Sequence, residues 1–495
     1  MEKEEEQHED NLQSSTGDKE SIATFTKERN VLQVSSDITD VPAELYTMIH
    51  WIMVGPADHG TIIAVYQKID PSKEPVAEPL IIGDAQSLSV TPYHVDILHC
   101  DKPKPQHAKR SEQFAISKGV SESYQLAHLG WVVASALSRK KAGETSSNIP
   151  GWAGYNSLLS ESLPLTQVGA LPLLPEVAHE WSTLLTVIMQ ANHLRKLAVG
   201  EDHPTVITFD MALYDKLVQL PDARPDLKQM VVPRLGELHV VMAALGASME
   251  NSGIDDAWIE ADVYGPATTR QILKCTHYKR ALHAHIYSYV ALYEMALEEF
   301  FKDNPQLKYV CLKATEGVKA ACSKGKDIKA ESVKQVNSTL LEATAEVITA
   351  FQEWEEQKSQ HVIFKAMMSY LHRVETILFF LAATRNADLE LHLQAGEALS
   401  KLFFAMDRIK YKRLWPRYIA DMHDLRINHP QTWEELRAGN ISVTKSVIPF
   451  VSVGADHACE PLNKLMKICS GIIGISNNAN ARQRLFMVTP ELSRL

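Results

Sequence analysis

The chain has 495 residues, 45% of them hydrophobic and 22% charged, a composition typical of a globular protein with more than one core. Asp and Glu outnumber Lys and Arg by 61 to 50, which gives a net charge of −11. Nonspecific nucleic-acid binding depends on an excess of Lys and Arg, so this balance excludes a protein that wraps nucleic acid by charge alone.

Cysteine usage and hydropathy indicate the compartment. The six cysteines are scattered without a C-x-x-C pair, which is typical of an intracellular chain with free thiols. The first ten residues are acidic and lack the apolar stretch of a secretory signal. No apolar run approaches the roughly 18 residues that a membrane span needs. We therefore expect a nuclear or cytoplasmic protein that is neither secreted nor bound to a membrane.

Residues 1–43 are predicted to form a disordered acidic tail. The first 40 residues hold eleven acidic and four basic residues and few aromatic ones. Such a segment buries too little apolar surface to offset the entropy that ordering would cost.

Residues 44–252 alternate between β-branched runs and segments with helical spacing. Strands are predicted at 61–66, 205–209 and 230–232, and helices at 121–140, 175–197, 211–219 and 238–249. This alternation predicts a sheet with helices packed against it.

Residues 253–440 are predicted to be an all-helical insertion, because apolar residues recur there with a period of 3.6. Its helices are expected at 281–300, 328–356, 361–384, 389–407 and 410–425. Strand-like runs reappear at 441–443 and 447–451, so residues 441–495 are predicted to return to the α/β unit and complete it.

Familiar nucleotide and nucleophile motifs are absent from the sequence. It contains no G-x-x-x-x-G-K-[ST], no G-x-G-x-x-G after a predicted strand, no G-x-S-x-G and no H-E-x-x-H. This excludes P-loop and dinucleotide-binding enzymes, serine hydrolases with a nucleophile elbow, and zincins.

The remaining candidate site residues are mainly acidic. Asp210 ends the strand predicted at 205–209, and α/β folds place ligand sites at the carboxyl ends of strands. Glu237 and His239 follow the next predicted strand, and Asp456 and Glu460 are spaced i, i+4, which places them on one helix face. Carboxylates in such positions can hold two Mg²⁺ ions for phosphodiester chemistry, because hard cations prefer oxygen ligands.

Each of these residues also has a structural interpretation. Asp210 before Met211 is typical of a helix N-cap. Glu237 is typical of a first-turn acid that the helix dipole favours, and His239 of a hydrogen-bonded core histidine. Asp456 and Glu460 would lie in a cap and on a solvated face. For single residues the structural interpretation is favoured, and the metal site depends on the acids occurring together.

Several segments resemble a group of poorly characterised, transposon-encoded animal proteins. The resemblance covers roughly residues 120–495 and is carried by Thr205–Tyr214, Gly236–Ala243, Gly454–His457 and Glu460, among others. It implies an RNase H-like fold of the DDE type, resembling the hAT transposases, with a helical insertion before the last acidic residue.

The resemblance also implies roles for the candidate residues. Asp210 would be an inner carboxylate, His239 a neighbour of the site and Glu460 the final acid, so that Asp210, Glu460 and Asp456 would hold Mg²⁺ or Mn²⁺. Family members carry an Asp-Asn-x-Asp run upstream of a segment like the one that begins at His59, and this chain lacks it. Pro461 also follows Glu460 directly.

Two hypotheses about function follow. The first is a DNA transposase or nuclease, inactive if the leading acidic residue is missing. The second is a non-catalytic nucleic-acid- or protein-binding scaffold, whose helical insertion supplies a surface for partners. Two further hypotheses have less support. A zinc site could be formed by Cys275, His277, His283 and His285, but their spacing does not match structural zinc sites. A small-molecule enzyme could use His239 as its general base, but no motif surrounds this residue.

Overall fold

The computed structural model of the chain describes residues 51–57, 60–68, 96–103, 120–138, 149–170, 177–199, 203–250, 252–322 and 330–461. These residues belong to two compact units. Unit 1 draws on Met1–Lys102, Pro164–Ile207 and Cys459–Leu495, and unit 2 on Pro103–Leu163 and Thr208–Ala458. The predicted tail at 1–43 lies outside the described residues.

Five short strands pair in the order β3-β2-β1-β4-β5. They are β1 (Trp51–Ala57), β2 (Gly60–Lys68), β3 (Thr166–Ala170), β4 (Thr205–Phe209) and β5 (Val231–Leu235). β1 and β2 are antiparallel, with Trp51 opposite Tyr66, and β2 and β3 are antiparallel, with Ala64 opposite Ala170. All five residues of β4 are buried, as expected for a β-branched run with no polar alternation. The strands predicted at 61–66, 205–209 and 230–232 are therefore confirmed.

Helices form the larger part of the described chain. Unit 1 contains α6 (Trp181–Val199). Unit 2 contains α4 (Glu122–Ser138), α5 (Trp152–Leu159), α7 (Met211–Leu217), α8 (Gln219–Ala223), α9 (Pro225–Lys228), α10 (Glu237–Met249), α11 (Ile254–Glu260), α12 (Pro266–Leu273), α13 (Tyr278–Asp303), α14 (Pro305–Cys322), α15 (Ala330–Lys358), α16 (Val362–Asn386), α17 (Leu389–Ala405), α18 (Ile409–Asn428), α19 (Pro430–Glu435) and the π-helical turn η4 (Leu436–Asn440).

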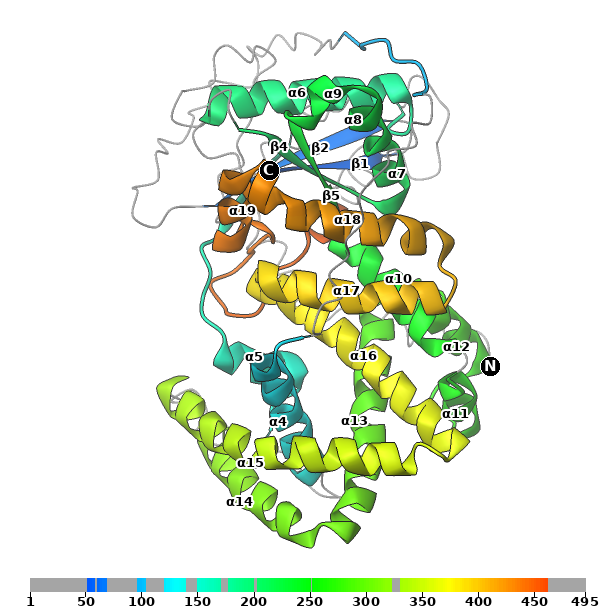
Figure 1. Cartoon of the computed structure of the whole chain (residues 1–495), viewed down its shortest axis with the longest axis vertical. Coiled ribbons are helices and arrows are strands. Elements are labelled where there is room, and N and C mark those ends of the chain that lie inside the picture. The colour runs from blue at the N-terminus through cyan, green and yellow to red at the C-terminus, as the bar shows by residue number, and fades with distance from the viewer. Residues whose placement is uncertain are drawn as a thin grey trace, which may run out of the picture. The chain divides into compact units, whose positions relative to one another are not determined.

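The core of unit 2 is built where α10, α13, α16 and α17 pack together. α16 carries the apolar run Ile377–Leu381, all of it buried, and α17 follows it after the sharp turn at Ala387, whose φ is 51°. Figure 1 shows α16 and α17 meeting at this turn and diverging along their lengths. The short connection makes the two helices neighbours.

Three buried hydrogen bonds between histidine and tyrosine join pairs of helices in unit 2. They are His128 Nε2 to Tyr289 Oη at 2.9 Å, His285 Nδ1 to Tyr370 Oη at 3.0 Å and His392 Nε2 to Tyr418 Oη at 3.0 Å. Burial lowers the pKa of each of these histidines to about 3, so the imidazoles are neutral at physiological pH. We call them the three His–Tyr pairs.

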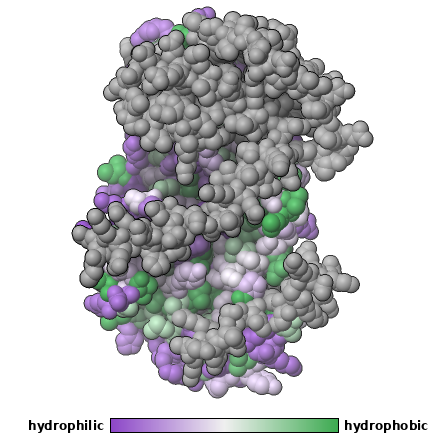
Figure 2. Space-filling view, turned by 180° about the vertical axis from the view of Figure 1, so that it is seen from behind, coloured by the Kyte–Doolittle hydropathy of each residue, from purple (hydrophilic) through white to green (hydrophobic). Residues whose placement is uncertain are grey.

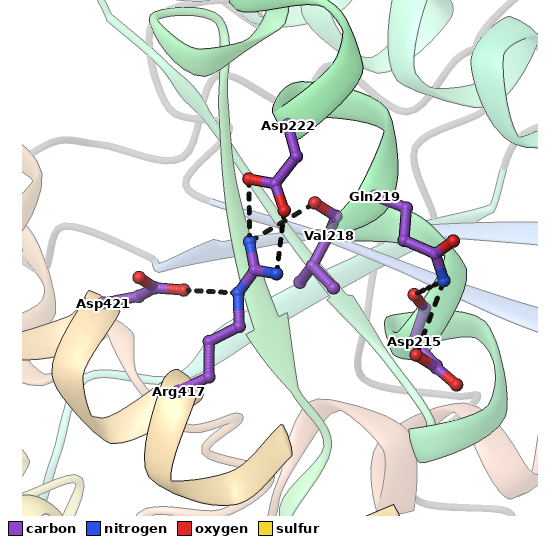
Figure 3. Close-up of polar contacts among 6 residues, drawn as sticks. All are labelled: Asp215, Val218, Gln219, Asp222, Arg417 and Asp421. Carbon is purple, nitrogen blue, oxygen red and sulfur yellow. Dashed lines mark hydrogen bonds and ion pairs between the residues drawn. The ribbon is translucent and has the colours of Figure 1, made fainter. Parts of the chain in front are cut away.

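An ion pair holds α18 against α8. Arg417 of α18 places its guanidinium between Asp222 of α8 and Asp421 of its own helix (Figure 3). Its Nη1 lies 2.9 Å from Asp222 Oδ2 and its Nη2 3.0 Å from Asp222 Oδ1, a two-pronged geometry that fixes direction as well as distance. Nη2 also donates to the carbonyl of Val218 at 3.3 Å.

The fold expected from the resemblance was wrong. An RNase H-like mixed sheet interrupted by an all-helical insertion was predicted, whereas the structure is mostly helical and strands make up only a small part of it. Helices also form before the predicted insertion, in α4, α7 and α10. Helix-to-helix packing therefore provides most of the buried core.

The strands predicted at 441–443 and 447–451 do not form. Only an isolated bridge between Val443 and Val453 is present among residues 441–453. Serine side chains take the place of a neighbouring strand, because Ser157 Oγ donates to the carbonyl of Pro449 at 3.1 Å and Ser162 Oγ to that of Val447 at 2.8 Å. Side-chain donors from a distant segment thus satisfy carbonyls of a backbone that the apolar pattern alone would assign to a sheet.

Among the residues that the structure describes, no helix has both the length and the apolarity to span a bilayer. On the face shown in Figure 2, apolar residues lie in small patches among polar ones. Small apolar patches of this kind are ordinary on protein surfaces.

Candidate functional site

Asp210 lies where β4 ends, and its side chain caps α7. Its backbone is extended, with φ −68° and ψ 169°, and its Oδ1 accepts a hydrogen bond from Leu213 N at 2.8 Å. This is the geometry of a helix N-cap, in which one oxygen satisfies an amide that has no partner within the helix. The structural interpretation of Asp210 is therefore confirmed.

Asp456 caps α10 from more than 200 residues away. The residue before α10 is Gly236, which has no side chain for capping. Asp456 supplies it instead, with Oδ1 accepting from Leu238 N and Oδ2 from His239 N, both at 3.1 Å. Oδ2 also lies 3.0 Å from the Nδ1 of His239, and Oδ1 accepts from His457 N at 2.9 Å. Both carboxylate oxygens are thus engaged.

The hydrogen bonds to Asp456 keep it ionised inside the protein. Its side chain is 1% exposed, and burial by itself would raise the pKa of a carboxyl. The hydrogen bond and charge of His239, with the amides of Leu238 and His239, outweigh burial and lower the pKa of Asp456.

Glu237 forms a second buried carboxylate beside Asp456. Its Oε1 pairs with Arg234 Nη2, and both side chains are almost fully buried. Burial raises the pKa of Glu237 to about 7, Arg234 opposes this shift, and the negative charge of Asp456 adds to it. Burial raises the pKa of Tyr418 of α18, and the charge of Arg234 opposes this shift.

Two glycines allow the carboxylates to approach the backbone. A Cβ at Gly236 would lie 2.5 Å from Asp456 Oδ2, and a Cβ at Gly454 would lie 2.7 Å from both Asp456 Oδ1 and Glu237 Oε2. Any other residue at either position would collide with these carboxylate oxygens. The glycines in the segments around residues 236 and 454 are therefore needed for close packing.

Glu460 does not share the environment of Asp456. Residues 455–461 are helical, so the predicted i, i+4 spacing holds, but Asp456 is buried whereas Glu460 is exposed. Asp456, His239 and Glu237 are brought together at the first turn of α10, while Asp210 caps a different helix.

The donor set does not fit the two-metal site that the resemblance implies. Both oxygens of Asp456 accept N–H groups, Oε1 of Glu237 pairs with Arg234, and Oδ1 of Asp210 caps α7. Across the described ranges, no group of three or more His, Cys, Asp or Glu residues is placed to hold a metal ion. The suggested zinc ligands have other contacts, since His285 bonds Tyr370 and His283 lies against Tyr287. We therefore derive no reaction step through a metal.

Three cations from distant segments act electrostatically on His457, next to Asp456. The pKa of His457 is lowered to about 4, mainly by burial and in part by the positive charges of Lys445, Lys279 and Arg385, while the charge of Asp456 opposes the shift. The ring of Tyr278 packs edge-on against His457, with centroids 5.6 Å apart. We call Lys279, Arg385 and Lys445 the cationic cluster.

Arg385 of the cationic cluster is held by two aromatic rings. Its guanidinium lies 5.0 Å from the ring centre of Trp152 and 5.4 Å from that of Phe450. Phe450 has a φ of 64°, a region that a bulky residue rarely adopts, so surrounding packing must hold it there. Sequence reasoning missed this cluster, because its members are far apart in the chain and follow no motif.

A family model described as a domain of unknown function, DUF8702, matches residues 151–495. The chain belongs to the DUF8702 family. No curated protein and no solved structure matches the chain. The DUF8702 match includes Asp210, Glu237, Asp456 and the whole cationic cluster, while the predicted kinship with transposon-encoded proteins stays a prediction.

Proposed function

We propose that this chain is a non-catalytic nucleic-acid-binding protein that contacts phosphates through the cationic cluster. The observation that carries the proposal is that the charges of Lys279, Arg385 and Lys445 all act on His457, while Arg385 is held against the rings of Trp152 and Phe450. The three come from α13, α16 and the segment after η4, so only the folded chain assembles them.

The state of the acidic residues argues against catalysis as the main role. The carboxylates expected to bind metal instead cap α7, cap α10 and pair with Arg234. A metal ion at Asp456 would have to displace N–H donors from a buried carboxylate, which leaves buried amides without partners and costs about 1 to 3 kcal/mol for each.

The cationic cluster suits the phosphodiester backbone of a nucleic acid. Lysine and arginine attract phosphate at any base sequence, and Arg385 is already fixed between Trp152 and Phe450, so little of its side-chain freedom is lost on binding. The net charge of −11 indicates contact at one local site rather than along a wide surface. The resemblance to transposon-encoded proteins also favours a nucleic-acid partner.

The test is binding of fluorescently labelled single-stranded DNA to the full chain, followed by anisotropy over a series of salt concentrations. We expect the logarithm of the binding constant to fall with the logarithm of salt concentration with a slope of about −2, as for about three phosphate contacts. In the double variant Lys279→Gln, Lys445→Gln, affinity should fall at least tenfold and the slope should become shallower.

The matched control is the double variant Lys308→Gln, Lys313→Gln, which removes the same charge from exposed positions on α14. It should bind DNA like the wild type. Equal losses in both double variants, or no loss in either, would contradict a specific role for the cationic cluster. NMR provides a second readout, because bound phosphate should raise the pKa of His457 from about 4.

A further inference from the structure

A groove is lined by the first half of α16 and the second half of α17, the parts of the two helices that diverge in Figure 1. It has a volume of about 470 Å³, within the range of known ligand pockets. The last turns of α15 and of α17 contribute Glu355 and Met406 to its lining. All of these elements belong to unit 2.

The lining of the groove combines apolar and cationic side chains. Phe364, Met368, Leu402 and Met406 supply apolar surface. Methionine is flexible and polarisable, and is common where a surface must fit the side chains of another protein. Because the apolar residues come from both α16 and α17, an apolar side chain that enters the groove would contact both helices.

The charges of the groove are mainly positive. Lys365, Arg373 and Lys401 line it, and Lys365 and Lys401 are exposed. The acidic lining residue Glu355 lies 3.4 Å from His372, which also lines the groove.

The arginine of the groove is fixed in place by backbone groups. Arg373 donates from Nη1 to the carbonyl of Glu250 at 3.1 Å and from Nε to that of Ser369 at 3.0 Å. Neither acceptor carries a formal charge, so the positive charge of Arg373 is not cancelled by these contacts.

The two helices that line the groove also carry exposed apolar residues. Val362 and Ile363 in the first turn of α16 are 81% and 86% exposed, and Phe404 near the end of α17 is 70% exposed. In sequence, Ile363 and Phe404 are next to the lining residues Phe364 and Ala405. Exposed large apolar side chains on these helices add to the apolar surface that a partner protein could cover.

We propose that the α16–α17 groove binds one amphipathic helix of a partner protein, whose apolar face enters the groove and whose acidic residues contact Lys365 and Lys401. An apolar stripe along one side of a helix matches the lining from Phe364 and Met368 to Leu402, and acidic side chains beside that stripe match the two exposed lysines. Because the partner's charges complement the groove, they set orientation and exclude basic helices.

The probe is a designed helical peptide with Leu at i, i+3, i+4 and i+7 and Glu on its flanks. Binding of the labelled peptide to the full chain is measured by fluorescence anisotropy. A second peptide carries Lys in place of Glu, and a third carries Ser in place of Leu. We expect the acidic peptide to bind at least tenfold more tightly than either of the other two.

Charge reversal provides the decisive comparison. The variant Lys365→Glu, Lys401→Glu should lose at least tenfold in affinity for the acidic peptide and gain affinity for the basic one. The control Lys308→Glu, Lys313→Glu on α14 should behave like the wild type. Equal binding of acidic and basic peptides, absence of binding, or equal effects of the two double variants would overturn the proposal.

Two further measurements distinguish a partner helix from other possible occupants of the groove. Ultracentrifugation of Ile363→Ser, Phe404→Ser should show the same mass as the wild type, and a loss of self-association would assign the groove to a second copy of this chain. DNA binding by Lys365→Glu, Lys401→Glu should also match the wild type. If that variant lost DNA affinity and the wild type did not bind the acidic peptide, the groove would belong to the nucleic-acid surface instead.

Discussion

The Nδ1 of His239 lies 3.0 Å from the Oδ2 of Asp456, although 217 residues separate the two in the chain. The same carboxylate accepts the amides of Leu238 and His239. The first turn of α10 and the segment that begins at Gly454 are therefore joined by one buried side chain. This contact brings together two segments of unit 2 that are separated in the chain by helices α11 to α19.

Asp456→Asn should destabilise the protein by about 3 kcal/mol, because an amide group cannot replace all the hydrogen bonds that the carboxylate accepts and leaves buried donors without partners. Urea unfolding followed by tryptophan fluorescence would show a lower midpoint. An unchanged midpoint would mean that the cap on α10 is not needed for the fold.

Two variants of Asp210 test whether this residue acts as a helix cap or as a metal ligand. Asn is as good an N-cap as Asp, so Asp210→Asn should unfold like the wild type, whereas Asp210→Ala should be less stable by about 1 kcal/mol. The measurement is again the urea midpoint, compared among the three proteins. Equal stability of all three would contradict the capping role seen at Leu213.

Gly454→Ala tests the close packing of the two carboxylates. Its Cβ would lie 2.7 Å from Asp456 Oδ1 and Glu237 Oε2, so we expect a loss of about 2 kcal/mol from overpacking. Gly151→Ala is the control, because a Cβ there meets nothing within 4 Å. The measurement is the midpoint of thermal unfolding of both variants. Equal decreases of the midpoint in Gly454→Ala and Gly151→Ala would contradict the account.

Acid should destabilise the protein through the three His–Tyr pairs. Their histidines have pKa values of about 3 in the folded chain and about 6.5 when unfolded. The unfolded chain therefore binds more protons as pH falls below 6.5, and each histidine should cost about 1 kcal/mol of stability per pH unit. Glu237 acts in the opposite direction, since its raised pKa favours the folded state as pH falls from 7 toward 4.5.

Urea midpoints at several pH values between 7 and 5 would measure this dependence. His285→Gln removes one of the three imidazoles, so its midpoint should fall less steeply with acid than that of the wild type. A stability that does not change over this range, or the same slope in His285→Gln, would show that the buried histidines do not control the response.

Local elements could be predicted from the sequence because their signals are local. The strand at Thr205–Phe209 has the bounds expected from its β-branched run, and the helical periods matched α13, α15, α16, α17 and α18 closely. The capping interpretation of Asp210 was also open to sequence reasoning, since Asp before a helix is a strong start signal.

Long-range relationships had no such signal. The Asp456 cap on α10 forms only because two segments that are distant in the chain meet in the fold. The i, i+4 spacing predicted that Asp456 and Glu460 share one helix face, but Asp456 is buried whereas Glu460 is exposed. The segment 441–451 has strand-like apolar residues, but donors from Ser157 and Ser162 satisfy its carbonyls instead of a sheet. The overall fold class was wrong because the alternating strand and helix signals at 44–252 and the resemblance both favoured a unit built around a sheet, whereas the structure is mostly helical.

The most direct test of the central claim is incubation of labelled single-stranded DNA with the full chain in Mg²⁺, with binding and strand length read from the same samples. Wild type and Asp210→Asn, which keeps the cap, should both bind the strand and leave it at full length. Metal-dependent cleavage by the wild type that disappears in Asp210→Asn would contradict the account, because it would show that this carboxylate serves catalysis.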